Sequence, residues 1–155
     1  MTTPTPQDLI IIGNGMVGHH LVEQLVERGT AAHFRITVFG EERHPAYDRV
    51  HLSEYFSGRD AADLALGEAD FYPTHDITLR LGEGVSRIDR ENREVITDQG
   101  RYPYDSLVLA TGSYPFVPPI PGAETGQPNR LVYRTLDDLD AIRAAATDAR
   151  RGVVV

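Results

Sequence analysis

The chain has 155 residues, of which 41% are hydrophobic and 25% charged, as expected for a soluble globular domain. Its formal charge of −8 argues against nucleic-acid and anionic-membrane partners, which attract basic proteins. The absence of cysteine excludes a disulfide framework, a thiolate nucleophile and a cysteine-ligated iron–sulfur cluster within these residues. The start of the chain lacks the features of a signal peptide, and its apolar runs are too short to span a bilayer, so we expect a cytoplasmic protein.

An aliphatic run, Leu9 to Ile12, opens directly into the pattern Gly-x-Gly-x-x-Gly at residues 13–18. In this pattern Gly13 permits a tight turn, Gly15 lets backbone amides approach a pyrophosphate, and Gly18 lets the helix pack on the strand. The helix that follows presents free N–H groups and the positive end of its dipole to the anion. The order of strand, glycine pattern and helix predicts a dinucleotide-binding βαβ unit. The alternative is an ordinary glycine turn without a ligand.

The first helix is expected to end at Arg28-Gly29, with aliphatic residues from Val17 to Val26 on its buried face. The pair His19-His20 is expected on its solvated face, without a metal. A second strand, at residues 35–39, leads into Gly40 and Glu41. The carboxylate can accept hydrogen bonds from ribose hydroxyls and would repel a 2′-phosphate, which predicts an adenosine with a free 2′-hydroxyl.

A long connection follows, and Arg49 is its most notable charge. Its planar guanidinium suits a phosphate or the pyrimidine edge of a flavin, whereas a surface ion pair with Asp48 or Glu54 is an equal alternative. Two short helical pieces are predicted in this connection, at residues 51–56 and 61–66. A further helical segment is predicted near residues 70–75, with His75 at its end.

Short strands are predicted at residues 77–81 and 85–89, with a hairpin whose arms are residues 93–97 and 101–104. A buried strand at 105–110 ends in Thr111-Gly112, where a glycine invites close approach by a ligand, although an ordinary loop glycine is the alternative. A proline-rich connector at 116–122 marks a sub-domain border. A capping box at Thr135 opens a helix to about Ala149, and residues 150–155 suggest a buried parallel strand of a truncated domain.

These elements predict an α/β chain with a truncated Rossmann-like fold, a parallel sheet with crossover helices and a small β-hairpin layer. Four segments carry a resemblance to a known family, at residues 11–19, 36–42, 47–56 and 110–115. From about Leu9 to Val155 the chain resembles the amino-terminal FAD-binding region of the large subunit of assimilatory NAD(P)H-dependent nitrite reductase. It is similar, more loosely, to ferredoxin and rubredoxin reductase flavoproteins. The segment Tyr-Asp-Arg-Val-His-Leu-Ser, which begins at Tyr47, is the specific element.

The resemblance implies a FAD-binding electron-transfer module whose first part of the FAD domain is residues 1–122. Residues 123–155 would be the connector helix and first strand of a truncated NAD(P)H-binding domain. NAD(P)H would reduce FAD, and electrons would continue through an iron–sulfur cluster to sirohaem, where nitrite becomes ammonium. These other groups would bind outside this chain, to the remainder of the large subunit, with a small subunit as a further partner. The fragment alone is therefore expected to be inactive.

The resemblance also implies the positions that bind FAD. The glycine turn would hold the pyrophosphate, Glu41 the ribose and the backbone at Val85 the edge of the adenine, while Arg49 would lie along the flavin. The implied cofactor-binding residues are Gly13, Asn14, Gly15, Met16, Val17, Gly18, Gly40, Glu41, Arg49, Val85, Ala110, Thr111 and Gly112. No catalytic residue and no metal ligand are expected in this chain.

The sequence leaves the roles of several residues open. Related reductases often carry a lysine near the flavin where Glu54 stands, and a carboxylate there would disfavour an anionic reduced flavin. The tyrosines Tyr47, Tyr55 and Tyr114 either stack near the cofactor or pack in a core, and His51 either approaches the flavin or packs in its loop. The rival functions are the FAD-binding part of a ferredoxin or rubredoxin reductase or NADH oxidase, and a non-catalytic nucleotide-binding module.

Overall fold

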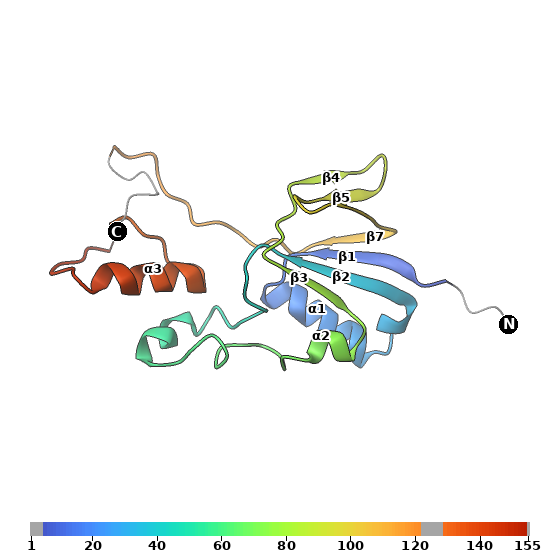
Figure 1. Cartoon of the computed structure of the whole chain (residues 1–155), viewed down its shortest axis with the longest axis horizontal. Coiled ribbons are helices and arrows are strands. Elements are labelled where there is room, and N and C mark those ends of the chain that lie inside the picture. Colours follow the sequence, from blue (N-terminus) through green and yellow to red (C-terminus); the bar gives the residue numbers. More distant parts are fainter. Residues whose placement is uncertain (1–4, 122–128, 155) are drawn as a thin grey trace.

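The computed structural model describes residues 5–121 and 129–154. Figure 1 shows a larger half built on a sheet and a smaller group of segments beside it that contains α3. None of the helices in these described residues is long and apolar enough to cross a lipid bilayer. The elements in chain order are β1 (Gln7–Ile12), α1 (Met16–Glu27), the 3₁₀ helix η1 (Ala31–His33), β2 (Phe34–Gly40), the 3₁₀ helix η2 (Leu52–Ser57), α2 (Phe71–Thr74), β3 (Thr78–Leu81), β4 (Arg87–Asp89), β5 (Glu94–Ile96), β6 (Arg101–Pro103), β7 (Ser106–Leu109) and α3 (Leu136–Ala146).

The main sheet has the strand order β3-β2-β1-β7, and every neighbouring pair is parallel. Ile11 of β1 lies opposite Val38 on one side and Val108 on the other. Because the strands are parallel, the carboxyl ends of β1, β2 and β7 meet at one edge, where ligands of such sheets bind. The predicted Rossmann-like α/β fold is confirmed.

Both faces of the sheet are covered, which explains the unbroken aliphatic run in β1. Leu9 and Ile11 pack with α1 and α2 in one apolar cluster, while Ile10 and Ile12 face a second cluster that includes Val95 of the small sheet. That small sheet, β4-β5-β6, is antiparallel and lies on the opposite side of the main sheet from α1 (Figure 1). Each fully buried Ile or Leu contributes about 1.5–3 kcal/mol, so β1 anchors both layers.

The smaller group of segments, which we call the lobe, consists of residues 46–66 together with residues 129–146. Five buried side chains form its core: Tyr47, Leu52, Leu64, Leu136 and Leu139. The predicted capping box is present, since the Thr135 hydroxyl accepts from the Asp138 amide and the Asp138 carboxylate accepts from the Thr135 amide. Two segments that are far apart in the sequence therefore build one lobe.

Several predictions about single elements are wrong. Residues 61–66 form turns, with Ala65 in an isolated antiparallel bridge to Tyr47, rather than a helix. The strand β7 is half-buried rather than buried, because it lies at the edge of the sheet. Residues 150–154 form no strand, and Val153 and Val154 are 88% and 99% exposed, because no described strand pairs with them. The predicted border at residues 122 and 123 lies outside the described residues, so the division into two parts stays a prediction.

Two expectations for α1 are also wrong. His19 is only 2% exposed, although a solvated position was predicted, because the segment that leads into α2 covers this side of the helix. Val17 is 73% exposed rather than buried, because it lies in the first turn of α1, which lines a cavity. The predicted stop is confirmed, since α1 ends at Glu27 and Gly29 adopts a positive φ.

Candidate functional site

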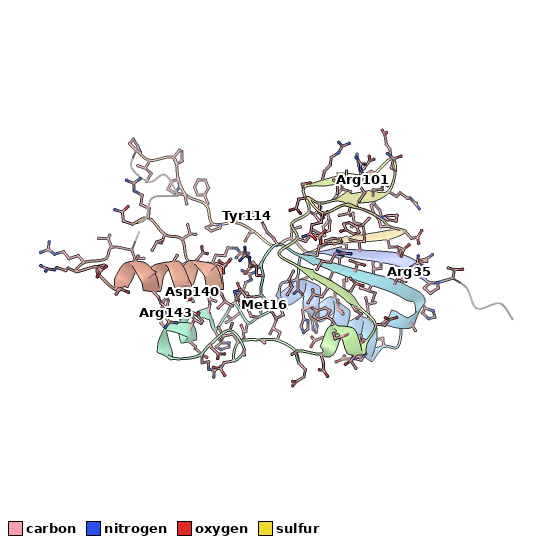
Figure 2. All side chains as sticks on the ribbon, in the orientation of Figure 1. Met16, Arg35, Arg101, Tyr114, Asp140 and Arg143 are labelled. Atoms are coloured by element: carbon pink, nitrogen blue, oxygen red, sulfur yellow. The ribbon has the colours of Figure 1, made fainter. Side chains whose placement is uncertain are left out.

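A cavity of about 530 Å³ opens at the carboxyl ends of β1, β2 and β7, between the sheet and the lobe. Figure 2 places Met16 and Tyr114 at this junction, with Arg35 at the opposite end of the sheet. All but one of the predicted cofactor-binding residues line the cavity, namely Gly13, Asn14, Gly15, Met16, Val17, Gly40, Glu41, Arg49, Val85, Ala110, Thr111 and Gly112. The exception is Gly18, which lies behind the turn.

Backbone atoms pack so closely around the turn after β1 that two of its positions have no room for a side chain. Gly13 has φ +112°, and a Cβ on it would lie 2.1 Å from the carbonyl oxygen of Ala110. A Cβ on Gly18 would lie 2.0 Å from the carbonyl oxygen of Gly13. Side chains at either position would clash with backbone, so β1, α1 and the end of β7 approach this closely only because both residues are glycine.

The second glycine of the pattern, Gly15, leaves open space beside the backbone. Gly15 is the N-cap of α1, no side chain caps this helix end, and its first turn has no acidic residue. A Cβ on Gly15 would meet nothing within 4 Å, and Gly15 lines the cavity. The first N–H groups of a helix have no partner within the helix, and they carry the positive end of its dipole. These features fit a phosphate or diphosphate at the mouth of α1.

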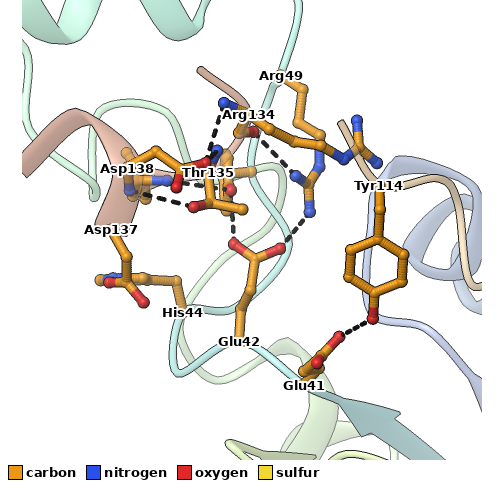
Figure 3. A network of polar contacts seen from close by, with 11 residues as sticks. Glu41, Glu42, His44, Arg49, Tyr114, Arg134, Thr135, Asp137 and Asp138 are labelled. Carbon is orange, nitrogen blue, oxygen red and sulfur yellow. Dashed lines mark hydrogen bonds and ion pairs between the residues drawn. The ribbon is translucent and has the colours of Figure 1, made fainter. Parts of the chain in front are cut away.

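The tip of β2 carries the predicted ribose acceptor. Glu41 is exposed, and its carboxylate accepts a hydrogen bond of 2.5 Å from the hydroxyl of Tyr114. This bond, drawn in Figure 3, connects the loop after β7 to the tip of β2 and raises the pKa of the Tyr114 phenol. A carboxylate has several acceptor sites, so Glu41 can also accept a ribose hydroxyl.

Arg49 pairs with neither Asp48 nor Glu54, the two surface partners that the sequence suggests. Its guanidinium forms an ion pair with Glu42 and donates to the carbonyl oxygen of Arg134 at 3.1 Å (Figure 3). Asp48 instead pairs with His51 at 2.7 Å, and Glu54 pairs with Arg59 at 3.0 Å. The surface-pair alternative is wrong, because the chain turns Arg49 inward toward the cavity that it lines.

Tyr47 joins this ion pair to the lobe. Its hydroxyl donates to Glu42 at 2.6 Å and accepts from the backbone N–H of Leu136 at 3.3 Å. The guanidinium of Arg49 lies 4.9 Å from the centre of the Tyr47 ring. Burial and the Glu42 carboxylate raise the pKa of Tyr47, so the phenol stays a donor. The two alternatives for Tyr47 are stacking near the cofactor and packing in a core, and the second is therefore the one observed.

Two further charged residues line the cavity, and no sequence pattern points to either of them. Arg134 immediately precedes the capping box of α3, and its Nη2 lies 3.2 Å from the point where a Cβ of Gly112 would stand. It brings a second cation to a cavity in which the charge of Arg49 is already balanced by Glu42. No local pattern links Arg134 to Gly112, because the lobe brings them together only in the folded chain.

Glu83 is the other missed residue, and it is 2% exposed. Its carboxylate accepts hydrogen bonds from Thr97 Oγ1 at 2.6 Å, from the hydroxyl of Tyr102 at 2.8 Å and from Arg80 Nη1 at 3.2 Å. Burial alone would raise the pKa of Glu83, but these three donors outweigh it and hold the pKa below its usual value. Glu83 thus fixes the wall of the cavity that contains Val85.

Other candidates lie away from the cavity. His51 is exposed and bonded to Asp48, so the loop-packing alternative describes it, and Tyr55 donates to Asp140 of α3 at 2.7 Å. Glu54 does not line the cavity. Within residues 5–121 and 129–154, no group of three or more His, Asp or Glu side chains is placed to hold a metal ion.

The model of the family described as pyridine nucleotide-disulphide oxidoreductase matches residues 7–155. The chain belongs to this family. The parallel sheet described above is the Rossmann-like fold of this family. Among solved structures, the covalent putidaredoxin reductase–putidaredoxin complex aligns with a TM-score of 0.77 and 32% identity, over 89% of this chain and 34% of that one.

Two curated relatives are similar over nearly all of the chain. The "Nitrite reductase [NAD(P)H] large subunit" of Klebsiella oxytoca is 56% identical over 100% of this chain, and the "Nitrite reductase (NADH) large subunit" of Escherichia coli (strain K12) is 49% identical over 95%. The chain spans only 16% and 17% of their lengths. It thus corresponds to one region of a larger subunit in these relatives, as the resemblance implies.

Proposed function

We propose that this chain is the FAD-binding electron-transfer module of an NAD(P)H-dependent nitrite reductase. The observation that carries the proposal is the cavity at the uncapped amino end of α1, where Gly15 leaves room for a diphosphate. The similarity to nitrite reductase large subunits supports the choice of reaction. The chain's own residues supply binding and orientation, as proteins do for flavin cofactors.

Each part of the dinucleotide has a group to bind it in this proposal. The backbone N–H groups at the start of α1 would hold the pyrophosphate, with Arg134 as its counter-charge across the cavity. Glu41 would accept the ribose hydroxyls of the adenosine, and Val85 would lie beside the adenine. Arg49 would stand on the flavin side, held there by Glu42.

When bound, FAD would supply the ability to accept two electrons as a hydride and to release them singly. The full enzyme would take the hydride from NAD(P)H and deliver electrons through an iron–sulfur cluster and sirohaem to nitrite, all bound outside this chain. The partners in this proposal are the remainder of the large subunit and a small subunit. A cytoplasmic location stays a prediction.

A second candidate is the equivalent part of a ferredoxin-type reductase. The 32% identity to the putidaredoxin reductase complex favours it, although the identity to nitrite reductases is higher. Both candidates require FAD in the same cavity, so FAD binding does not distinguish between them. It distinguishes both from a module that binds NAD or ADP without redox chemistry. A visible spectrum of the complex shows the flavin absorption directly.

The test is FAD binding by the wild-type chain and by Gly15→Ala, measured by equilibrium dialysis. A methyl group at residue 15 points into open space, so the variant should fold, with a loss of no more than about 1 kcal/mol for alanine at an N-cap. It should lose at least about tenfold in affinity, since the methyl excludes the diphosphate. Gly152→Ala is the matched control, because a Cβ there also meets nothing within 4 Å and the site is remote. A wild-type chain that binds neither FAD nor ADP would contradict the proposal, as would full affinity in Gly15→Ala.

A further inference from the structure

A chain of buried hydrogen bonds runs behind the glycine turn. His19 Nδ1 lies 2.8 Å from the hydroxyl oxygen of Tyr72, and that hydroxyl donates to Asn14 Oδ1 at 2.7 Å. His19 and Tyr72 are 2% and 5% exposed, and Asn14 lies within the turn that lines the cavity. The three residues thus connect the middle of α1 and the helix α2 to the loop between β1 and α1.

One phenol links the imidazole to the glycine turn. The Tyr72 hydroxyl oxygen lies within hydrogen-bond distance of both His19 Nδ1 and the side-chain amide of Asn14. Burial lowers the pKa of His19, which favours the neutral ring. The other ring nitrogen, Nε2, lies 3.5 Å from a carboxylate oxygen of Glu23.

Packing holds the members of this chain in place. The His19 ring lies 5.3 Å from the Phe71 ring and 5.7 Å from the Tyr72 ring, measured between centroids. A Cβ on Gly67 would come within 2.9 Å of the imidazole, so the segment before α2 closes directly on it. On the other side, Asn14 Cβ lies 3.1 Å from the place of a Cβ on Gly40. The amide of Asn14 is thus held between β2 and Tyr72.

We propose that His19 and Tyr72 are positioning residues that fix Asn14, and with it the backbone of residues 13–16, in the conformation that receives a diphosphate. This inference rests on the proposed function. A loop that is ordered before its ligand arrives binds more tightly, because the entropy of ordering has already been lost on folding. Asn14 is held in this way by a hydrogen bond to a buried tyrosine that is itself bonded to a buried histidine.

The first experiment is a double-mutant cycle on Asn14 and Tyr72, with ADP as the probe for the diphosphate half of the cavity. Tyr72→Phe keeps the ring and removes the hydroxyl, and we expect a loss of about fivefold in ADP affinity, as for one hydrogen bond. Asn14→Ala should lose as much, and the double variant should bind no worse than Asn14→Ala. Additive losses would overturn the inference, because they would mean that the two side chains act separately.

Tyr55→Phe is the control, because its hydroxyl bonds to Asp140 in the lobe and leaves the cavity untouched. It should keep wild-type affinity for ADP. His19→Asn places an amide near the position of Nδ1 that can hydrogen-bond to Tyr72, and it should restore most of the affinity that His19→Ala loses. Equal losses in the two His19 variants would contradict a role through hydrogen bonding to Tyr72.

The second readout is the hydrogen bond of His19 Nδ1, observed by ¹⁵N NMR of the chain. Nδ1 should show the shift of a hydrogen-bonded ring nitrogen in the wild type and should lose it in Tyr72→Phe. Loss of this bond with unchanged ADP affinity would overturn the positioning role while leaving the proposed function intact. A wild-type chain without affinity for ADP or FAD would instead overturn the proposed function, and this inference with it.

Discussion

The two walls of the cavity are built in different ways. The wall at the edge of the sheet is mostly backbone, formed by the glycine turn after β1 and by residues 110–112 after β7. The facing wall comes from the lobe and consists of side chains, above all Arg134 and Arg49. Arg49 pairs with Glu42 and donates to the carbonyl oxygen of Arg134. The first wall follows from consecutive residues, whereas the second exists only once segments 85 residues apart have come together.

This difference indicates how the two walls should respond to mutation. The sheet wall lies between two apolar clusters and cannot shift without disturbing β1, so changes there should affect the whole fold. The lobe has one small core of its own and depends on polar contacts for its position. Changes in the lobe should therefore loosen it locally and leave the sheet intact.

The largest effect is expected for Gly18→Ala. A methyl group 2.0 Å from the Gly13 carbonyl oxygen would force α1 away from β1, so the free energy of unfolding should fall by at least about 3 kcal/mol, or the chain should not fold. Urea denaturation measures this change. Gly15→Ala, three residues earlier, should lose no more than about 1 kcal/mol, as expected for alanine at an N-cap. Similar stabilities of the two variants would contradict the packing described for the turn.

A smaller effect is expected for Glu83→Gln. The Glu83 carboxylate joins the main sheet to the small one. The amide can satisfy fewer of the three donors around residue 83, so stability at pH 7 should fall by about 1.5 kcal/mol. The pKa of Glu83 is held below its ordinary value of 4.5, so its contribution is present above that pH and is lost as the pH falls through the lower, folded-state pKa.

Denaturation at a series of pH values therefore separates the two proteins. The difference in stability between the wild type and Glu83→Gln should be constant from pH 7 to about pH 5 and should shrink below that. A difference that persists undiminished at pH 3 would show that the hydrogen-bonded carboxylate does not stabilise this joint.

The smallest effect is expected for Tyr47→Phe in the lobe. It removes the bonds to Glu42 and to the Leu136 amide, and should cost about 1 kcal/mol. Hydrogen exchange should speed up in α3 while the amides of β1 keep their protection, because only the lobe loosens. Tyr55→Phe is the control, since its hydroxyl bond lies at the surface. Faster exchange in β1 would mean that the lobe and the sheet are one cooperative unit.

The same contrast explains what could be predicted from the sequence. The sheet, its parallel order, the hairpin layer and the capping box follow from local patterns such as the aliphatic run into Gly13 and the pair Thr135 and Asp138. The predicted cavity residues were found together because most of them follow directly after strands whose carboxyl ends share one edge. That they bind FAD stays a proposal.

What the sequence did not reveal depends on contacts between distant segments. His19 lies on the polar side of its helix by pattern, yet Tyr72, 53 residues later, gives it a buried partner. Arg134 and Glu83 carry no motif, and only the fold brings them to the cavity. Arg49 lines the cavity, but its ion-pair partner Glu42 lies at the tip of β2 rather than at Asp48 or Glu54, the partners that the sequence suggests.

The most direct test of the central claim is a crystal structure of the chain grown with excess FAD. We expect the diphosphate within about 3 Å of the backbone nitrogens at the start of α1, where hydrogen bonds form, with a ribose hydroxyl on Glu41. A dinucleotide bound elsewhere, or a turn at residues 13–16 that stays free of it at saturating FAD, would contradict the proposed site.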